Sequence, residues 1–404
     1  MSTSLLYHSQ NIMGYTFEGI SFKEGTCIFR IRPQDRLVRC PICGSGDVQS
    51  RGSVHRTLML LPTGLHKNYA ELDIPRVYCP KCDKLRQIRL GFAEEFRSHS
   101  KAFERYVRDL CGFMTINDVA RHLDVPWSTV KEIHKRHLDK KYRTPSLRKL
   151  TSIAIDEIYL GKKHKYLTIV LNLENGAVVF IGKGKGSDAL EPFWVKLGRR
   201  KKKIRSVAID MSPAYTKAVR ENLPQATRVY DHFHVIKLYN EKLSDLRRTL
   251  YRETKDADMK ELLKGTRWLL LKNQENLNEK QNEHERLAKA LAANRPLMTA
   301  YYLKEELRRI WEQPDRLAAE EVFDAWVATA EVSDVGMLKR FAKTLEAHRE
   351  GILNYYDSRI TTAALEGTNT KIRVLQRRAY GYRDEEYLKL RILALHETNL
   401  KKTT

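Results

Sequence analysis

The sequence lacks any apolar run long enough to cross a bilayer, and its N-terminal segment MSTSLLYHSQ lacks the basic-then-apolar order of a signal peptide. Cysteine is scarce as well, because six cysteines in 404 residues do not make a disulfide framework. Low-complexity stretches and repeats of solenoid period are also missing. These absences predict a soluble, cytoplasmic protein with no membrane-spanning segment and no long disordered region.

Acidic residues are few relative to basic ones, 50 against 73, which leaves a formal net charge of +23. Because such an excess repels itself, it indicates a polyanionic partner rather than a requirement of folding. Nucleic acid is the first candidate and an anionic membrane surface the second. Hydrophobic residues make up 42% of the chain, enough for real cores, and the length predicts two to four domains.

The spacing of apolar residues changes several times along the chain. The first zone alternates as strands do, with Glu24-Gly25 suited to a hairpin turn, and the second has helical spacing. The basic stretch Lys140–Lys149 is predicted to be a linker. A zone with the pattern of a mixed α/β sheet follows, and then two helical zones. In order, the five zones are 15–90, 96–145, 150–232, 233–350 and 358–398.

Four of the six cysteines form two pairs with metal-binding spacing, Cys40-Pro-Ile-Cys43 and Cys79-Pro-Lys-Cys82. A C-x₂-C turn brings two thiolates to one ion, and two such turns complete a tetrahedral Zn²⁺ site. The 35-residue spacer is longer than usual, but the alternating segment Tyr69–Tyr78 can fill it with strand. Since all four ligands would be sulfur, the pairs predict one structural zinc; buried free thiols are the alternative.

Residues 115–138 have the anatomy of a helix-turn-helix. Thr115 and Asp118 suit a variant capping box, Val125-Pro126 ends the first helix, and Ser128 is expected to cap the second. An upstream amphipathic helix is predicted at Lys101–Leu110. The alternative is a helical hairpin buried in a core, but the charge favours DNA binding. The predicted inner face of the second helix is Val130, Ile133 and His137, and its predicted groove-facing side is Ser128, Thr129, Lys131, His134 and Lys135.

Two segments nearly repeat each other and end in aspartate, Ser152-Ile-Ala-Ile-Asp156 and Ser206-Val-Ala-Ile-Asp210. Each is a short apolar run of the kind that lies centrally in a sheet. If the two strands are parallel neighbours, their carboxyl ends place the aspartates side by side, where open α/β sheets hold their ligands. Two adjacent carboxylates repel each other, and a divalent cation relieves that repulsion. For either aspartate alone, a capping or loop role would be the default.

The elements around these aspartates follow the order β-β-β-α-β-α-β, which is that of a ribonuclease-H-like fold. The turn Glu174-Asn175-Gly176 joins the second strand to the third. The predicted strands are Ile153–Leu160, Tyr166–Leu173, Val178–Lys183, the strand ending at Asp210, and Thr227–Tyr230, and the predicted helices are Asp188–Leu197 and Pro213–Asn222.

A third carboxylate, Glu366, begins a basic helical segment. On a helix, Glu366, Asn369 and Arg373 share one face. A metal ligand with polar and cationic side chains behind it suits phosphodiester chemistry. The alternative is a solvated basic helix, on which Arg377 and Arg378 contact only the DNA backbone.

Together these motifs resemble the bacterial insertion-sequence transposases of the ISL-three family, over essentially the whole chain. The most specific parts are the four cysteines, the run AIDEIY at 154–159, and the segments EGTNTKIR and RRAYGYR between Glu366 and Arg383. The resemblance implies catalytic roles for Asp156, Asp210 and Glu366. Arg373 stands where relatives often carry lysine, which keeps the charge.

A multi-domain α+β architecture follows from the motifs and the resemblance. The 155 residues between Asp210 and Glu366 are too many for a loop, and they predict an insertion inside the catalytic fold. The expected domains are a β-rich zinc ribbon at 1–92, a helix-turn-helix DNA-binding domain at 93–145, a ribonuclease-H-like α/β DDE catalytic domain at 150–239 and 351–404, and an all-helical insertion at 240–350.

Two short motifs precede or lie in the predicted insertion. Asp231-His-Phe-His234 resembles the D-x-x-H signature that several transposase families place after the second aspartate. Arg267-Trp268 resembles their Arg-Trp pair, which is suspected of supporting a flipped base. A structural hydrogen bond for His234 and a core position for Trp268 are the alternatives.

The predicted mechanism uses Asp156, Asp210 and Glu366 to bind two Mg²⁺ ions, which serve first an attacking water and then a DNA 3′-hydroxyl. The zinc ribbon and helix-turn-helix would bind terminal inverted repeats in double-stranded DNA, and a homodimer or larger homo-oligomer would pair the two ends before they join target DNA. Such a protein would associate with the nucleoid. A metal-dependent nuclease without strand transfer and a non-catalytic DNA-binding regulator are the alternative functions.

Overall fold

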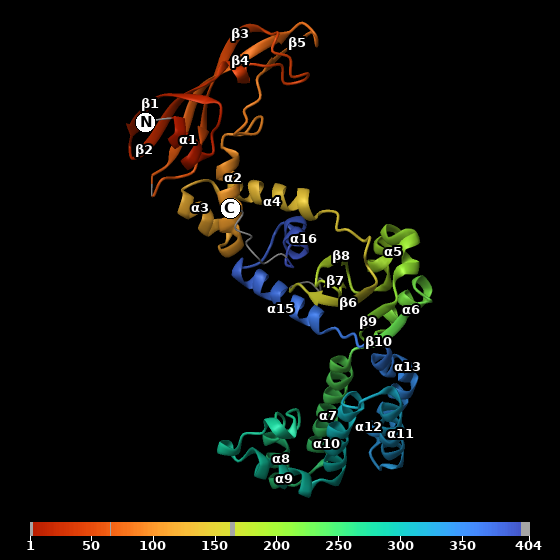
Figure 1. Ribbon diagram of the computed structural model, residues 1–404. Coiled ribbons are helices and arrows are strands. Elements are labelled where there is room, and N and C mark those ends of the chain that lie inside the picture. Colours follow the sequence, from red (N-terminus) through yellow and green to blue (C-terminus); the bar gives the residue numbers. More distant parts are fainter. Residues whose placement is uncertain (1–2, 65, 162–165, 397–404) are drawn as a thin grey trace. The chain divides into compact units, whose positions relative to one another are not determined.

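The computed structural model describes residues 3–64, 66–161 and 166–396, and the chain divides into two compact units between Arg143 and Thr144 (Figure 1). The first unit holds a β-sheet and a three-helix group, and the second holds a mixed sheet and a large helical part. No helix within the described ranges is long and apolar enough to span a membrane.

The first unit opens with α1 (Thr3–Gln10) and a five-stranded sheet of order β1-β2-β4-β3, with β5 on the far end of β4. The predicted turn at Glu24-Gly25 is confirmed, and both residues have positive φ, which is the geometry that a two-residue hairpin prefers. Strand β4 is central to the sheet, because it pairs with β2, β3 and β5 and its alternate side chains are buried in the core. The strands are β1 Tyr15–Lys23, β2 Thr26–Pro33, β3 Gln49–Met59, β4 Asn68–Cys79 and β5 Lys84–Gln87.

Three helices follow, α2 (Lys101–Phe113), α3 (Ile116–Leu123) and α4 (Trp127–Tyr142). The predicted capping box of Thr115 and Asp118 is present at the start of α3. Helix α4 begins directly after Pro126, without a side-chain cap, so the expected capping role of Ser128 is wrong. At its other end α4 continues to Tyr142, into the stretch predicted to be a linker.

The buried stripe of α4 is wider than predicted. Val130 and Ile133 are buried as expected, but His134 is also buried, only 6% exposed, whereas His137 is partly exposed. His134 lies one turn after Val130 and one turn before the buried Leu138, so it belongs to the same apolar stripe. The expectation that His134 faces outward is therefore wrong.

The second unit contains the mixed sheet, with strand order β10-β9-β6-β7-β8. Strands β6, β7 and β8 are antiparallel neighbours, and β6, β9 and β10 run parallel, so the expected ribonuclease-H-like strand order is present. Helix α5 starts later than predicted, because its first turn, Ser187–Leu190, is a 3₁₀ turn. The elements are β6 Ser152–Tyr159, β7 Tyr166–Asn172, β8 Val178–Lys183, α5 Glu191–Leu197, β9 Ser206–Ile209, α6 Pro213–Asn222 and β10 Thr227–Tyr230.

A large helical part lies between β10 and the final two helices (Figure 1). Its core continues from that of the sheet: buried Tyr239 of α7 packs edge-on against Phe341 and donates a hydrogen bond from its hydroxyl to the Ala300 carbonyl at 2.6 Å. The helices are α7 His232–Glu253, α8 Ala257–Gly265, α9 Glu283–Ala293, α10 Arg295–Arg308, α11 Arg316–Val332, α12 Gly336–Ala347, α13 Arg349–Leu353 and α14 Tyr355–Ser358.

The chain returns from the helical part along the outer edge of β10. Asn354 donates a hydrogen bond from Nδ2 to the Arg228 carbonyl at 2.9 Å, and Gly351 of α13 lies against the ring of Tyr230. Helix α15 (Ala363–Arg378) then packs against β6, and α16 (Glu385–Leu393) packs against β8. The helical piece predicted at 358–398 is thus two helices that cover different strands.

Replacement of Gly351 by alanine is expected to destabilise the second unit, because the added Cβ would lie 2.3 Å from the Tyr230 ring. Such overpacking typically costs about 1–3 kcal/mol. Gly367, on α15, has open space at the same position, so Gly367→Ala should be neutral or slightly stabilising. Urea unfolding of both variants measures the difference, and equal stabilities would contradict the packing argument.

Candidate active site and nucleic-acid interface

Three aspartates lie at the carboxyl ends of three adjacent parallel strands. Ala154 pairs with Ala208, so Asp156 is level with Asp210 one strand away. Tyr230 pairs with Ile209, so Asp231 is level with Asp210 on its other side. Neighbouring strands are about 4.8 Å apart, and one edge of the sheet therefore carries three carboxylates in a row. The predicted proximity of Asp156 and Asp210 follows directly from this register.

Burial makes the ionised state of these aspartates costly. It raises the pKa of Asp156 to about 6, and the charge of Asp210 adds to the effect, while His234 works in the opposite direction. Burial also raises the pKa of Asp210, partly offset by the backbone N–H of Ser212, which donates to Asp210 Oδ1 at 3.0 Å. A nearby cation would relieve the cost that both groups incur as anions.

Glu366 is brought next to Asp231 and His234. One ligand atom from each of these three residues lies within 4.8 Å of the other two. Glu366 Oε1 is buried without a hydrogen-bond partner, and burial together with the charge of Asp231 raises the pKa of Glu366. This tight group was not expected, because the sequence motifs predict that Glu366 lies with Asp156 and Asp210 and that Asp231 and His234 are auxiliary residues.

Asp231 and His234 form a pair at the first turn of α7. His234 Nδ1 lies 3.1 Å from Asp231 Oδ2, and the Asp231 side chain is almost completely buried. Burial opposes charge on His234, but the hydrogen bond with Asp231 and the nearby Asp156 raise its pKa. Asp231 is affected in the opposite sense: burial favours its neutral form, but the hydrogen bond with His234 lowers its pKa. The hydrogen bond between the two side chains therefore shifts their pKa values in opposite directions, lower for Asp231 and higher for His234.

Helix α15 is attached to β6 through Asn369. Its Nδ2 donates to Asp156 Oδ2 at 2.8 Å, and its Oδ1 is buried without a partner. Asn369 lies one turn after Glu366, so the same helix face that carries the glutamate also positions the aspartate. Arg373, on the following turn, is exposed, as are Arg377 and Arg378 at the end of α15.

Glu157 is a further acidic group at this edge, in addition to the three aspartates and Glu366, and its position there was not expected from the sequence. It follows Asp156 directly, and burial and the charge of Asp210 raise its pKa, while a hydrogen bond with Tyr215 lowers it. Tyr215 in turn lies 3.1 Å from the hydroxyl of Thr168 on β7. Successive residues of a strand point to opposite faces of the sheet, so the sequence pattern does not predict that Asp156 and Glu157 are both affected by the charge of Asp210.

In the first unit the four paired cysteines gather at one end of the sheet. Cys40 Sγ lies 3.9 Å from Cys82 Sγ, and Cys43 Sγ lies 3.6 Å from Cys79 Sγ. Tetrahedral Zn–S bonds of about 2.3 Å require sulfur separations of about 3.8 Å, which these distances match. The N–H groups of Cys43 and Ile42 lower the pKa of Cys40 to about 6, whereas the hydrogen bond with Cys43 and burial raise the pKa of Cys82. The long spacer between the pairs is the antiparallel ladder of β3 and β4.

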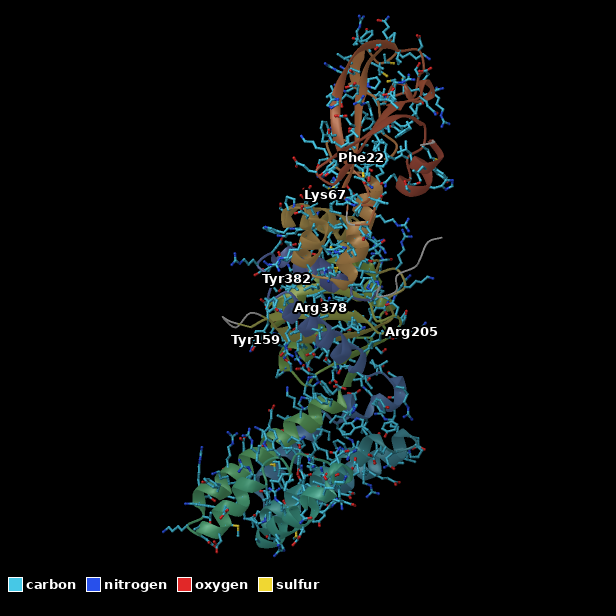
Figure 2. The ribbon with its side chains drawn as sticks, turned by 90° about the vertical axis from the view of Figure 1, so that its left-hand side faces the viewer. Phe22, Lys67, Tyr159, Arg205, Arg378 and Tyr382 are labelled. Carbon is cyan, nitrogen blue, oxygen red and sulfur yellow. The ribbon has the colours of Figure 1, made fainter. Side chains whose placement is uncertain are left out.

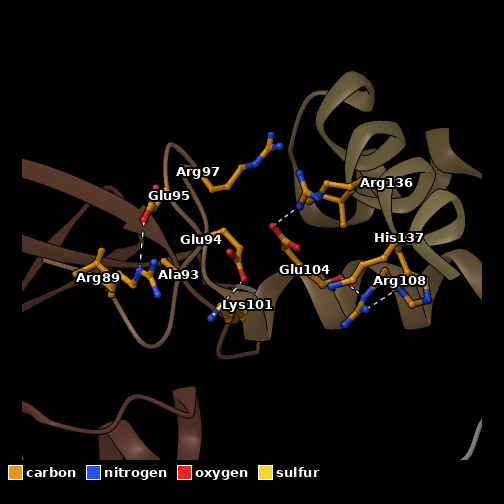
Figure 3. A pocket seen from close by; sticks show the side chains of 13 residues that line it. Arg89, Ala93, Glu94, Glu95, Arg97, Lys101, Glu104, Arg108, Arg136 and His137 are labelled. Carbon is orange, nitrogen blue, oxygen red and sulfur yellow. Dashed lines mark hydrogen bonds and ion pairs between the residues drawn. The ribbon is translucent and has the colours of Figure 1, made fainter. Parts of the chain in front are cut away.

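The sheet and the three helices of the first unit are joined beside a polar cavity of about 830 Å³ (Figure 3). The segment before α2 is bound to the end of β3, because Met59 N donates to the Ser98 carbonyl and Ser100 N to the Met59 carbonyl, both at 2.8 Å. Glu104 of α2 pairs with Arg136 of α4, and Arg97 pairs with Glu132. These contacts join the Met59 end of β3, which is opposite to the cysteine end of the sheet, to α2 and α4 within one unit.

The residues predicted to contact DNA have different environments. On α4, Ser128 is exposed, while Thr129, Lys131 and Lys135 are partly exposed, and the Lys131 ammonium lies 5.8 Å from the centre of the Trp127 ring. In the helical part, Trp268 is 65% exposed, which excludes the core position left open by the sequence. The Arg267 guanidinium lies 4.7 Å from the centre of the Trp268 ring.

Comparison with known proteins places similar sequences along nearly the whole chain. Residues 153–392 match a transposase domain model of the ISL3 family, residues 88–138 the helix-turn-helix domain of transposase family ISL3, and residues 36–82 the zinc-finger of the transposases of IS204, IS1001, IS1096 and IS1165.

Two transposases of known insertion sequence elements are similar to this chain over most of their own length. The transposase for insertion sequence element IS1001 of Bordetella parapertussis is 32% identical over 96% of this chain and 97% of its own. The transposase for IS1557 of Mycobacterium tuberculosis is 28% identical over 92% of this chain and 90% of its own. Among solved structures, the Drosophila P element transposase strand transfer complex aligns with 74% of this chain and 92% of its own at a TM-score of 0.40 and 11% identity.

The cysteine geometry predicts about one zinc per chain, the stoichiometry of a single four-thiolate site. Cys79→Ser should lose the metal and unfold the β3–β4 end of the sheet, since structural zinc contributes folding free energy. Cys27→Ser is the matched control, because Cys27 lies outside the cluster. Elemental analysis of reduced, full-length protein checks both variants, and an equal zinc content in Cys79→Ser and wild type would refute the assignment.

Proposed function

The chain belongs to the ISL3 family of transposases, and on that premise we propose that it cleaves DNA at the terminal inverted repeats of its insertion sequence and joins the 3′-hydroxyl ends to target DNA. The observation that carries this proposal is the row of carboxylates on β6, β9 and β10, with Glu366 of α15 beside it. Phosphodiester chemistry needs charge stabilisation and positioning more than it needs a protein nucleophile.

The residues at this edge of the sheet fit divalent metal. Carboxylate oxygens are the ligands that Mg²⁺ prefers, and Glu366 Oε1 is a buried oxygen without a partner. We assign Asp156, Asp210 and Glu366 as the ligands of two Mg²⁺ ions, with Asp231 and His234 beside Glu366 as auxiliary residues. When bound, the ions would lower the pKa of an attacking hydroxyl and stabilise the leaving oxygen.

Neighbouring residues of the chain would orient these ligands and stabilise their negative charges through hydrogen bonds. Asn369 fixes one oxygen of Asp156 and leaves the other to the N–H of Glu157. Asp231 accepts a hydrogen bond from His234 Nδ1, so the imidazole is held in place while its Nε2 stays available for a substrate oxygen. We propose that this imidazole contacts the DNA phosphate, because its pairing with Asp231 through Nδ1 leaves Nε2 as the nitrogen that can donate to a phosphate oxygen.

DNA recognition would be divided between the two units. In the first unit, the zinc-bound sheet and Ser128, Thr129, Lys131 and Lys135 of α4 would read the terminal repeats. In the second, Arg373, Arg377 and Arg378 of α15 would contact backbone phosphates, and Trp268 with Arg267 would stack on an unpaired base. Two ends must be brought together for transposition, so the proposal includes a homodimer or larger homo-oligomer on DNA.

Asp156→Asn and Asp210→Asn should abolish cleavage while DNA binding persists, because each removes a charged ligand and barely changes shape. Loss of Lewis-acid activation is worth several kcal/mol, so the rate should fall by roughly a hundredfold or more. Asp210→Asn is the easier variant to interpret. Each oxygen of Asp156 accepts a hydrogen bond, and an asparagine at that position has only one oxygen to accept both. Glu191→Gln, an exposed acid of α5, is the charge-matched control.

Incubation of labelled end DNA with Mg²⁺ measures these rates and separates the candidate functions. Cutting followed by joining supports a transposase reaction, cutting alone a nuclease, and neither a DNA-binding regulator. If Asp210→Asn cuts at the rate of Glu191→Gln, the assignment of Asp210 as a metal ligand is wrong.

Sequence preference should depend on α4 and not on α15. Lys131→Ala with Lys135→Ala should reduce the preference for terminal repeats over random duplex, each lost specific contact being worth about 1–3 kcal/mol. Arg377→Ala with Arg378→Ala should weaken binding to both DNAs equally. It should also reduce the slope of log affinity against log salt concentration by roughly one to two units. Titrations of both DNAs across a salt series test this, and an equal loss on both DNAs for the α4 variant would contradict base reading by α4.

A further inference from the structure

A strongly basic turn lies in the second unit, directly before strand β9, which Asp210 follows. Residues 196–206, KLGRRKKKIRS, contain seven cationic side chains and no acidic one. Most of them belong to the 3₁₀ turn Gly198–Lys203 between α5 and β9. We refer to Arg199, Arg200, Lys202, Lys203 and Arg205, all of which are exposed, as the basic ridge.

The backbone of the basic ridge is fixed on both sides. Leu197 before the turn and Ile204 after it are completely buried in the core of the unit. Gln225 donates from Nε2 to the carbonyls of Lys201 and Ile204, at 2.7 and 3.2 Å. Lys201 turns inward and donates from Nζ to Asn222 Oδ1 at 2.8 Å, which explains why it alone is not on the exposed side. The ridge is therefore a built surface and not a frayed loop.

Within the described parts of the chain, no carboxylate lies within 4 Å of any cation of the ridge. Other surface cations of the unit do have such partners: Lys217 pairs with Glu221 and Arg248 with Asp245. Five like charges held on one short turn repel one another, and an anionic partner relieves that repulsion. The ridge is thus complementary to a polyanion.

The ridge lies at the opposite end of β9 from the carboxylates. Arg205 precedes the strand and Asp210 follows it, five residues or roughly 16 Å away. In Figure 2, Arg205 lies on one side of the unit and Tyr159, at the carboxyl end of β6, lies on the other. If the scissile phosphate of a duplex lies at Asp156 and Asp210, the basic ridge would contact that duplex at the opposite end of β9.

We propose that the basic ridge binds the phosphate backbone of target DNA. This inference rests on the proposed function, which requires two DNA substrates, of which the first unit reads only the transposon end. The ridge has no aromatic side chain to stack on bases and no helix to enter a groove, so it suits sequence-independent contact with duplex backbone. Roughly 16 Å is the length of four to five base pairs, a distance at which the ridge can hold a target flank near the joining site.

The test compares two variants that each lose three exposed cations from the same unit. The ridge variant is Arg200→Ala, Lys202→Ala and Lys203→Ala; the control variant is Lys339→Ala, Arg340→Ala and Lys343→Ala on α12. Full-length protein is first bound to immobilised end DNA, and capture of a labelled random duplex is measured across a salt series. The ridge variant should capture at least tenfold less target near 150 mM salt and recover as salt is lowered, while its end binding stays within twofold of wild type.

A charge-conserving variant, Lys202→Arg with Lys203→Arg, should capture target as wild type does, which separates charge from folding. Equal losses of target capture in the ridge and control variants would overturn the proposal, because any group of surface cations would then bind target DNA equally well. Loss of end binding in the ridge variant would also overturn it, since the ridge would then hold the transposon end. Capture needs no cleavage, so a wild-type protein that captures target but fails to cut would contradict the proposed function and leave the ridge supported.

Discussion

The parallel register of β6, β9 and β10 is the constraint on which the rest of the second unit depends. Because β9 pairs in step with both neighbours, Asp156, Asp210 and Asp231 end at one level of the sheet. The cost is a cluster of buried like charges, visible in the raised pKa of Asp156 and Asp210. The surrounding contacts offset that cost: Asn369 donates to one aspartate, Ser212 to the second, and His234 to the third.

The position of Glu366 depends on where the helical part ends. Helices α13 and α14 are fixed to β10 by the Asn354 hydrogen bond and by the close contact of Gly351 with Tyr230. The chain therefore re-enters the sheet beside Asp231, and α15 starts a few residues later. The large insertion separates Asp210 from Glu366 in sequence but returns its two ends to the same edge.

Sequence reasoning worked where a local pattern determines structure. The near-repeat at Asp156 and Asp210 predicted adjacent strands, and the Glu24-Gly25 turn and the Thr115 capping box are both confirmed. It did not work where packing between distant segments decides. The grouping of Glu366 with Asp231 and His234 depends on the return path of 155 residues, and the burial of His134 depends on the width of the apolar stripe. The metal-binding and DNA-contacting roles of these residues stay predictions.

Asp231 is at once the last residue of the sheet edge and the residue from which α7 starts. Helix α7 has 22 residues and so is about 33 Å long, and His234 lies in its first turn. Its buried residues Val235, Tyr239 and Leu243 belong to the core that continues from the sheet. The orientation of the imidazole therefore depends on the packing of the whole helix as well as on its own hydrogen bond with Asp231.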